Sequence, residues 1–421
     1  MRIPLSGLVV LIGCLPITVW SVQNTESAGE LFFETYSDPG LNRFVRVVVD
    51  TNPRVQAARA ALDASRARES AAGMPLYNPE LEADYENAVD RTWEVGIGQT
   101  LDWAGKRKAR TSVAASDRHA IEADYMATRR DIAVDLLAGL THYQTGVQRD
   151  ALAIERDRIM REFAELAQRR FDAGDLNQVE ADLATLAYVE AQIQRATAAA
   201  DLAEAKQEVR NLTLLSASDQ WPVVETELPS MPNLDDPQKL VLGLPEILAA
   251  QRRVDAADAL VELRERERRP DPRLGLRGGQ EDDSTLIGVN LSIPLFIRNS
   301  FKYEVTAAVA ERDRAQQILD DMLRRAYVRF IGASERYQIS RDAWRGWEQT
   351  GQISLQRQGD LLQRLWEAGE LSTTDFLVQV RQTLDTRESA LDLRLTMWRA
   401  WFEWLAASGQ VDNWLGMEKS P

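Results

Sequence analysis

Phe171-Asp172-Ala173-Gly174-Asp175-Leu176 recurs 195 residues later as Trp366-Glu367-Ala368-Gly369-Glu370-Leu371. Each copy reads aromatic, acid, Ala, Gly, acid, Leu, and each stands between long stretches without proline. Glycine adopts the left-handed conformation that ends a helix, and an acid is favoured at the start of the next helix by the helix dipole. Each copy therefore predicts the turn of a helical hairpin, and the pair predicts a duplicated architecture.

The stretches that flank these turns have helical periodicity. Residues 106–170 contain no proline, and Ile132, Leu136 and Leu140 recur at steps of four. A continuous helix of this length would reach about 98 Å. Two further proline-free stretches predict an antiparallel return helix after the first turn and a second long hairpin around the other: residues 177–215 and 295–420.

Each half also contains a candidate β-hairpin, recognised by alternating apolar and polar residues. The alternating segments are residues 80–86, 93–103, 274–276 and 287–295. The second of them carries Trp93 and Trp103 at the ends of its apolar face and small, polar or acidic residues on the other. Lipid outside, water inside and an aromatic at each interface produce this pattern, whereas a half-buried hairpin of a soluble protein is the alternative.

The chain divides into three parts. Residues 1–21 resemble a secretory signal peptide, and Leu11-Ile12-Gly13-Cys14 within them resembles a lipobox, which makes Cys14 a candidate for lipidation. Residues 22–243 form the first repeat and residues 244–421 the second, each with a helix, a β-hairpin and a long helical hairpin. The two repeats align at Asn52-Pro53 with Leu244-Pro245 and at Asn78-Pro79 with Asp271-Pro272.

Residues 216–243 contain several prolines and are expected to link the repeats without regular helix. Beyond the leader no run of 18 apolar residues is present, so entry into a membrane would require a β-barrel. Four strands cannot close such a barrel, because membrane barrels need at least about eight strands. The sequence therefore predicts assembly from several copies.

Composition excludes several classes of function. Acidic residues exceed basic ones by 65 to 50, and the basic residues are interspersed with acids, so nucleic acid is not an expected partner. One cysteine and two histidines rule out a disulfide framework and a structural zinc site. His119 and His142 lie on helical patterns, and neither a phosphate loop nor a nucleophile elbow is present. We predict no catalytic, cofactor-binding or metal-ligating residues and no cofactor.

Two motifs in register with the duplication carry a family resemblance. Leu101-Asp102-Trp103-Ala104-Gly105-Lys106-Arg107-Lys108-Ala109-Arg110 is similar to the strand-to-helix region of the TolC-like outer-membrane efflux proteins of the cobalt-zinc-cadmium type. Ser292-Ile293-Pro294-Leu295-Phe296-Ile297-Arg298-Asn299 is similar to a second segment of that group. The resemblance implies a mainly α fold with a small β part, in which duplicated helical hairpins form a trimeric α-barrel. The two β-hairpins would contribute four strands to a 12-stranded outer-membrane β-barrel.

The same resemblance implies a passive exit duct of a tripartite efflux system that exports divalent heavy-metal cations. Its partners would be two further copies, a periplasmic adaptor, a proton-driven inner-membrane pump reached through the adaptor, and outer-membrane lipid. The expected location is the outer membrane of a Gram-negative type envelope, with a long periplasmic part. A multidrug duct, a type I protein-secretion duct and a periplasmic coiled-coil scaffold without a pore are the alternatives.

The two turns would then be the periplasmic tips. Adaptor docking would use their aromatic, glycine and leucine positions: Phe171, Gly174, Leu176, Trp366, Gly369 and Leu371. A trimer would also gather the acids of the tips into a ring that favours cations or acts as a gate: Asp172, Asp175, Glu180, Glu367, Glu370 and Asp375. Helix capping is the alternative interpretation for Asp175 and Glu370.

A basic cluster, Lys106, Arg107, Lys108 and Arg110, begins the first long helix, where the helix dipole disfavours positive charge. Anionic lipid headgroups beside the barrel would explain this location, and a solvated helix face is the alternative.

Overall fold

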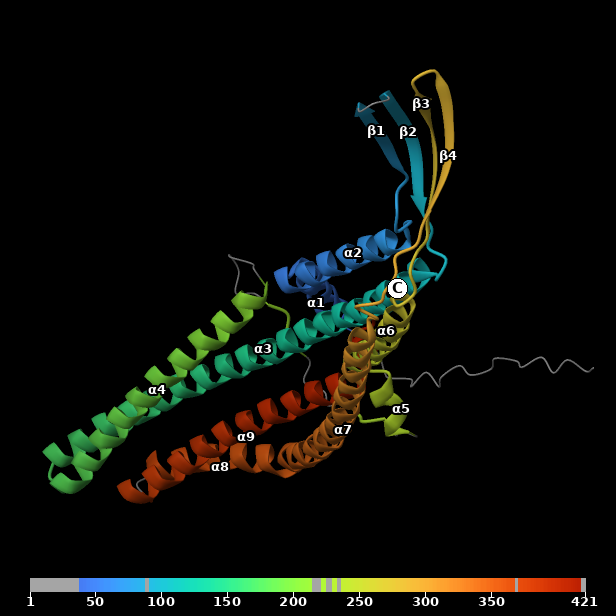
Figure 1. The fold of residues 1–421 in the computed structure, drawn as a ribbon. Coiled ribbons are helices and arrows are strands. Elements are labelled where there is room, and N and C mark those ends of the chain that lie inside the picture. The colour runs from blue at the N-terminus through green and yellow to red at the C-terminus, as the bar shows by residue number, and fades with distance from the viewer. Residues whose placement is uncertain are drawn as a thin grey trace, which may run out of the picture.

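A computed structural model of the chain describes residues 38–87, 91–213, 221–224, 229–232, 236–367 and 370–417, without the side chains of residues 356, 359, 360, 363, 366 and 367. The predicted signal peptide and Cys14 lie outside these residues. The described chain is mainly helical, with one small sheet at the end of the molecule opposite the two helical tips (Figure 1). The first half contains α1 (Pro39–Thr51), α2 (Pro53–Gly73), β1 (Glu80–Asn87), β2 (Arg91–Thr100), α3 (Lys106–Asp172) and α4 (Gln178–Thr213).

The second half repeats this order with differences. Its elements are α5 (Pro237–Leu242), α6 (Pro245–Glu267), β3 (Arg273–Glu281), β4 (Ser284–Ser292), α7 (Lys302–Gly346), a π-helical turn (Trp347–Gly351), α8 (Gln352–Glu367), α9 (Thr373–Ser408) and α10 (Val411–Trp414). Helix α5 lies inside the predicted linker, so the expectation of no regular helix there is wrong. It forms because Asp236 accepts hydrogen bonds from the backbone N–H groups of Gln238 and Lys239, and Pro237 suits the first helical position.

The predicted break at Asn52-Pro53 is confirmed, and one residue explains it. Asn52 ends α1 and caps α2, since its Oδ1 accepts a hydrogen bond of 2.9 Å from the backbone N–H of Arg54. Pro53 then occupies the first position of α2, where its missing N–H costs nothing. In the second half, Leu244-Pro245 starts α6 with proline at the same place.

The four strands predicted from the alternation are present, and they form one antiparallel sheet in the order β1-β2-β3-β4. Leu101 and Trp103, which continue the apolar pattern of β2, lie beyond its end in the connection to α3. Likewise β4 ends at Ser292, two residues before Pro294, whose nitrogen cannot donate to a strand ladder.

The predicted long helix of the first half is continuous over 67 residues in α3, which gives a length of about 100 Å. The corresponding long helix of the second half is not continuous. Helix α7 passes through the π-helical turn into α8, and Figure 1 shows that α7 and α8 run in different directions. A π-helical turn is a recognised cause of a helix kink; Gly346 precedes this turn and Gly351 is its last residue.

Two hydrophobic clusters stabilise this arrangement. The larger joins α1, α3, α6, α7 and α9, and its largest side chains are the fully buried Trp398, Trp401, Trp404 and Tyr337. Trp401 stacks on Trp404 at a ring-centroid distance of 4.9 Å and contacts Tyr337 at 4.8 Å. The smaller cluster lies towards the tips and includes Phe163 of α3 and Phe376 of α9, 5.5 Å apart. Both clusters therefore connect the two halves of the chain.

An ion-pair network connects three helices near the larger cluster. Glu246, in the first turn of α6, accepts bonds of 2.6 Å from Arg130 of α3 and 2.6 Å from Arg329 of α7. Burial alone would raise the pKa of Glu246, but the positive charge of Arg130, with help from Arg329, lowers it below its ordinary value. Ionised Glu246 therefore stabilises the folded state at neutral pH.

We expect Glu246→Gln to lower the free energy of unfolding at pH 7 by about 1–3 kcal/mol, since it weakens charged hydrogen bonds between partly buried groups. Because the folded-state pKa is depressed, this contribution is complete above the ordinary glutamate pKa of about 4.3 and disappears as the pH falls below the folded value. The difference in unfolding free energy between the wild-type protein and the variant should thus become smaller in acid. Thermal unfolding in detergent at pH 7 and at lower pH measures it.

Glu265→Gln, which changes an exposed carboxylate on the same helix, is the matched control and should leave the unfolding midpoint unchanged. An equal loss of stability in both variants would show that the network around Glu246 contributes nothing specific.

Candidate functional sites at the helical tips and the sheet

The first tip ends α3 with a left-handed glycine. Gly174 has φ +82°, its N–H donates to the carbonyl of Phe171 at 2.9 Å, and the N–H of Asp175 donates to the carbonyl of Arg170 at 2.8 Å. These two bonds define a Schellman motif, which satisfies carbonyl groups that the helix end would leave unpaired. The conformation expected of Gly174 is therefore present.

The second tip repeats this geometry as far as the structure describes it. Gly369 and Ala368 lie outside the described residues, but the N–H of Glu370 donates to the carbonyl of Leu365 at 2.9 Å, which matches the bond from Asp175 to Arg170. Trp366 and Glu367 end α8, and their side chains are not described.

Different residues from those predicted cap the helices that follow. At α4 the Oδ1 of Asn177 accepts from the N–H of Glu180, and the Oε2 of Glu180 accepts from the N–H of Asn177. At α9 Ser372 Oγ accepts from the N–H of Asp375 at 3.1 Å and donates to its carboxylate at 2.7 Å. The first is a capping box, and the second is a side-chain cap at the equivalent position 195 residues later, so neither Asp175 nor Glu370, the alternative candidates, is the cap residue.

The tip residues divide into packed and exposed groups. Leu176 and Leu371 are half-buried against the smaller hydrophobic cluster, and Phe171 is half-buried as well. Asp172, Asp175, Glu370 and Asp375 are exposed, whereas Glu180 is half-buried within its capping box. The leucines thus hold the tips in place, and the acids and Gly174 form the surface available to another molecule.

At the other end of the molecule, one face of the sheet is apolar and uncovered. The strand register aligns Leu81, Ile97, Leu276 and Val289 across the four strands. Their side chains are 81%, 55%, 56% and 74% exposed. Ala83, Val95 and Ile287 continue this face in the next row. A contiguous apolar surface of this kind marks an interaction with lipid or with protein.

The opposite face is charged, and an arginine spans it. Four acids of β1 lie there, namely Glu80, Glu82, Asp84 and Glu86. Arg273 of β3 reaches across β2 to Glu82 and to Glu80, where Nη2 lies 2.7 Å from Oε2. Gly98 leaves room for this path, since a Cβ there would lie 2.8 Å from Nη2 of Arg273.

Of the four basic residues at the start of α3, two form hydrogen bonds within the protein and two are exposed to solvent. Lys106 is buried, and its Nζ donates to Oδ2 of Asp271 at 3.0 Å, an atom that also accepts from the Tyr77 hydroxyl at 2.7 Å. Burial and the bond to Asp271 raise the pKa of Tyr77 to about 12, which keeps the hydroxyl protonated. Arg110 donates to the carbonyls of Ala72 and Met74 at the end of α2.

Both sequence-based interpretations of this cluster are therefore wrong for Lys106 and Arg110, which connect the sheet to the helices. Only Arg107 and Lys108 of the four are exposed. Asp102, which precedes the cluster, accepts from the N–H groups of Lys106 and Arg107 and so caps α3.

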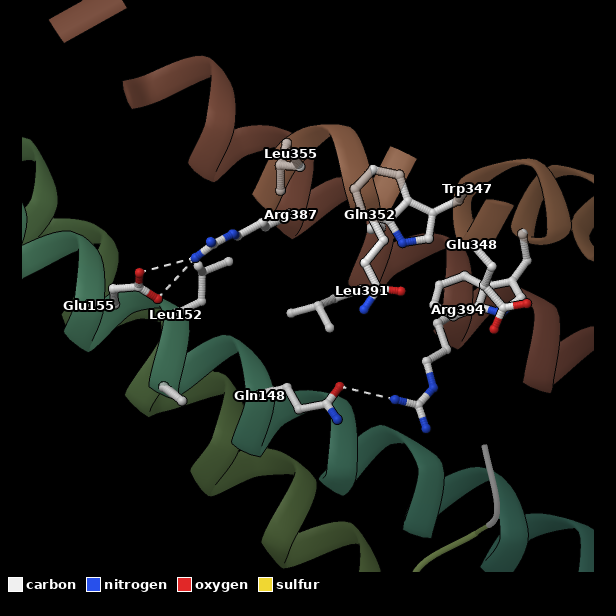
Figure 2. Close-up of a pocket in the computed structure, with 13 residues that line it drawn as sticks. Gln148, Leu152, Glu155, Trp347, Glu348, Gln352, Leu355, Arg387, Leu391 and Arg394 are labelled. Carbon is white, nitrogen blue, oxygen red and sulfur yellow. Dashed lines mark hydrogen bonds and ion pairs between the residues drawn. The ribbon is translucent and has the colours of Figure 1, made fainter. Parts of the chain in front are cut away.

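A cleft of about 710 Å³ lies between α3, α9 and the kinked region from α7 to α8. Figure 2 shows Arg387 and Arg394 of α9 extending to Glu155 and Gln148 of α3, with donor–acceptor distances of 3.0 and 3.4 Å, while Trp347 lies on the opposite side. Burial lowers the pKa of Arg394 from its ordinary value, and nearby Glu348 acts in the opposite direction. The cleft thus separates the straight helix of the first half from the kinked helix of the second.

Neither histidine belongs to a reactive constellation. His119 Nδ1 lies 3.6 Å from Glu122, and His142 Nδ1 lies 2.9 Å from Glu208, both on the surface of α3. Among the described residues, no group of three or more His, Cys, Asp or Glu side chains is arranged to hold a metal ion. In the same part of the chain, no helix is both long and apolar enough to cross a membrane.

The sequence profile described as "Outer membrane efflux protein" matches residues 46–213 and 237–410, which is more than half of the chain. The chain belongs to the outer membrane efflux protein family. The resemblance noted from its motifs is therefore confirmed. Members of this family are channels, so the prediction that the chain is not an enzyme is also confirmed.

One relative is the cobalt-zinc-cadmium resistance protein CzcC of Cupriavidus metallidurans. It is 26% identical over 324 residues, which cover 74% of this chain and 76% of CzcC.

Solved channels share the fold of this family member. CusC, whose structures concern folding and transmembrane channel formation, superimposes with a TM-score of 0.73 at 17% identity, over 89% of this chain and 93% of CusC. The Campylobacter jejuni CmeC outer membrane channel gives 0.74 at 16% identity, over 92% and 88% of the two chains. The predicted fold, mainly α with duplicated hairpins and four strands, is confirmed.

A substitution at Gly174 tests whether its left-handed conformation maintains the structure of the tip. Gly174→Val places a β-branched side chain at φ +82°, at a cost of about 1–3 kcal/mol. No atom lies within 4 Å of a Cβ built there, so this cost arises from the backbone alone. We expect faster amide hydrogen exchange across residues 170–178 and an unchanged global unfolding midpoint.

Ala173→Val introduces the same side chain one residue earlier, where φ is −81°, and should leave exchange at the tip close to that of the wild-type protein. Equal exchange in the two variants would show that the glycine conformation does not maintain the tip.

Proposed function

We propose that this chain is the passive outer-membrane exit channel of a tripartite efflux system that exports divalent heavy-metal cations. The observation that carries the proposal is the four-stranded sheet, which has one exposed apolar face and stands at the end of a helix about 100 Å long. An apolar face of this kind suits lipid, and a helix of this length suits a crossing of the periplasm.

The assembly follows from the size of the sheet. Four strands are too few for a membrane barrel, which needs at least about eight. Three copies would supply twelve strands, and their helical hairpins would then surround a continuous duct. The charged face of each sheet, with its acids and Arg273, would line the interior, and the apolar face would contact lipid.

The proposed roles of the tips are to bind the adaptor and to gate the duct. They lie at the end of the molecule farthest from the sheet (Figure 1), where an adaptor connected to an inner-membrane pump would meet the channel. Phe171, Gly174, Leu176, Trp366, Gly369 and Leu371 are the proposed docking positions. In a trimer the acids at the tips would form a ring at the mouth of the duct: Asp172, Asp175, Glu180, Glu367, Glu370 and Asp375.

The proposed substrate is supported by one relative and by two sequence motifs. CzcC is described as a cobalt-zinc-cadmium resistance protein, and the motifs from Leu101 to Arg110 and from Ser292 to Asn299 resemble that type. A duct needs no binding site for its cargo, because the pump selects what enters.

We expect a lipid-facing charge to disturb assembly. Val289→Arg lies on the exposed apolar face, where burial of arginine in the bilayer would cost about 2–4 kcal/mol. The amount of heat-modifiable trimer recovered from outer membranes should fall. Asn290→Arg, the next residue on the same strand but on the charged face, is the matched control and should assemble normally.

Equal recovery of trimer in the two variants would mean that the apolar face does not meet lipid.

A deletion strain tests the cargo. We expect loss of the protein to lower the minimal inhibitory concentrations of cobalt, zinc or cadmium several-fold and those of lipophilic drugs much less, with recovery on re-expression. The opposite ranking would remove the metal assignment and leave the channel assignment intact.

A further inference from the structure

The two connections from the sheet to the long helices expose apolar side chains. Trp103, between β2 and α3, is 65% exposed, and Leu295 and Ile297, between β4 and α7, are 75% and 83% exposed. Tyr303, in the first turn of α7, is 82% exposed. Figure 1 shows both connections at the base of the sheet. Exposed aromatic and aliphatic side chains at the end of an uncovered apolar sheet are typical of a membrane–water interface.

The connection to α7 has a defined structure. The N–H of Phe301 donates to Asn299 Oδ1 at 3.0 Å, and the ring of Phe301 contacts that of Phe296 at a centroid distance of 4.9 Å. Phe301 has φ +56°, a left-handed conformation that is unfavourable for a bulky residue. Gly105, at the same position before α3, has φ +69°. The exposed apolar side chains are therefore attached to backbone that is held in place by specific contacts.

Exposed cations accompany these apolar side chains. They come from the start of α3, the end of α6 and the connection to α7, and none of their side chains has a hydrogen bond or ion pair with a residue that the structure describes. The five cations, here called the basic collar, are Arg107, Lys108, Arg269, Arg298 and Lys302.

Local structure does not account for the basic collar. Three of its five cations lie in the first turns of α3 and α7, where the helix dipole disfavours positive charge. Two acids of this region are already bonded, since Asp102 caps α3 and Glu267 accepts from Arg264 at 2.7 Å. Glu304, in the first turn of α7, is half-buried. In a chain with a net charge of −15, unpaired cations at one level indicate an anionic partner outside the chain.

The opposite end of the sheet has a different charge. There Asp282 and Asp283 are exposed in the turn between β3 and β4, beside Arg91. Tyr85 and Trp93, paired across β1 and β2 near this end, are 67% and 48% exposed. Strands of 8 to 10 residues suit one crossing of a bilayer. Aromatic side chains therefore mark both ends of the apolar face, whereas the basic collar lies at the helical end.

We propose that the basic collar binds the phosphate groups of anionic phospholipids in the leaflet on the helical side of the sheet. Trp103 and Tyr303 would lie at the boundary between acyl chains and headgroups, and the cations beside them would reach the phosphates. Arginine donates two parallel hydrogen bonds to a phosphate, and lysine extends its apolar stem to bring its amino group to the headgroup. This inference rests on the proposed function, under which that leaflet is the inner leaflet of the outer membrane.

The charge of the headgroup should decide binding. A zwitterionic phospholipid carries its own cation beside the phosphate, whereas phosphatidylglycerol offers uncompensated negative charge to the collar. Because the five cations are exposed, salt should weaken the attraction. We therefore expect a preference for phosphatidylglycerol over phosphatidylcholine that depends on ionic strength.

Spin-labelled lipids measure this preference. The full-length protein is reconstituted into phosphatidylcholine bilayers that contain a trace of spin-labelled phosphatidylglycerol or, separately, spin-labelled phosphatidylcholine. Electron paramagnetic resonance then gives the fraction of each label that the protein immobilises. We expect several-fold stronger association of the phosphatidylglycerol label at ~10 mM salt, where the Debye length is about 30 Å, and near-equal association at ~1 M, where it is about 3 Å.

Replacement of all five collar cations by glutamine should abolish the preference. The variant should still fold, because the removed charges have no acceptor among the described residues, and heat-modifiable oligomer in outer membranes checks this. The matched control removes the same charge from exposed arginines away from the sheet and should keep the preference. Its substitutions are Arg161→Gln, Arg169→Gln, Arg357→Gln, Arg364→Gln and Arg399→Gln.

Arg107→Lys combined with Arg298→Lys keeps the charge of the collar and should keep most of the preference. Equal preference in the collar variant and the arginine control would overturn the site, as would a wild-type protein that does not distinguish the two labels. Immobilised lipid without a headgroup preference would sink only this inference. A protein that immobilises no lipid of either kind would sink the proposed function as well.

Discussion

Backbone hydrogen bonding at the two open edges of the sheet is the constraint on which the rest of the molecule depends. A strand edge that faces lipid leaves N–H and C=O groups without partners, at a cost of several kcal/mol each in the absence of water. The described chain ends its sheet at β1 and β4 and so cannot satisfy these groups alone. The duplication places one inner and one outer strand in each hairpin.

The two halves differ in their long helices. Helix α3 is continuous, whereas its counterpart is kinked by the π-helical turn between α7 and α8. Charged contacts connect the halves beside the kink: Arg156 of α3 bonds to Asp385 of α9 at 2.8 Å, and Arg387 bonds to Glu155 at 3.0 Å. These pairs are partly exposed, so salt screens them, and each contributes little by itself. The buried tryptophans at the sheet end of α9 form the firmer connection.

Sequence predicted the parts of this structure that depend on local rules. Proline at positions 53 and 245 marks helix starts, alternation marks the strands, and Gly174 adopts the expected left-handed conformation. Prediction failed where the partner is distant in sequence. Lys106 was assigned to solvent or lipid, yet Asp271, 165 residues away, holds it. Capping by Asp175 and Glu370 was the alternative interpretation of these acids, but the cap residues lie two positions later, at Asn177 and Ser372.

On the proposed function, the acidic charge at both ends of the molecule would favour cations. On the polar face of the sheet, Arg273 and Arg277 compensate only part of the charge of the β1 acids and Glu94. At the tips, Asp172 and Asp175 are exposed, and no three metal-ligating side chains converge among the described residues. On the proposed function, a divalent ion would meet a favourable potential from these exposed carboxylates. Conduction requires that an ion be drawn in and that it also leave. On the proposed function, selectivity for a metal then belongs to the pump that loads the duct, and the channel contributes only the sign of the charge it favours.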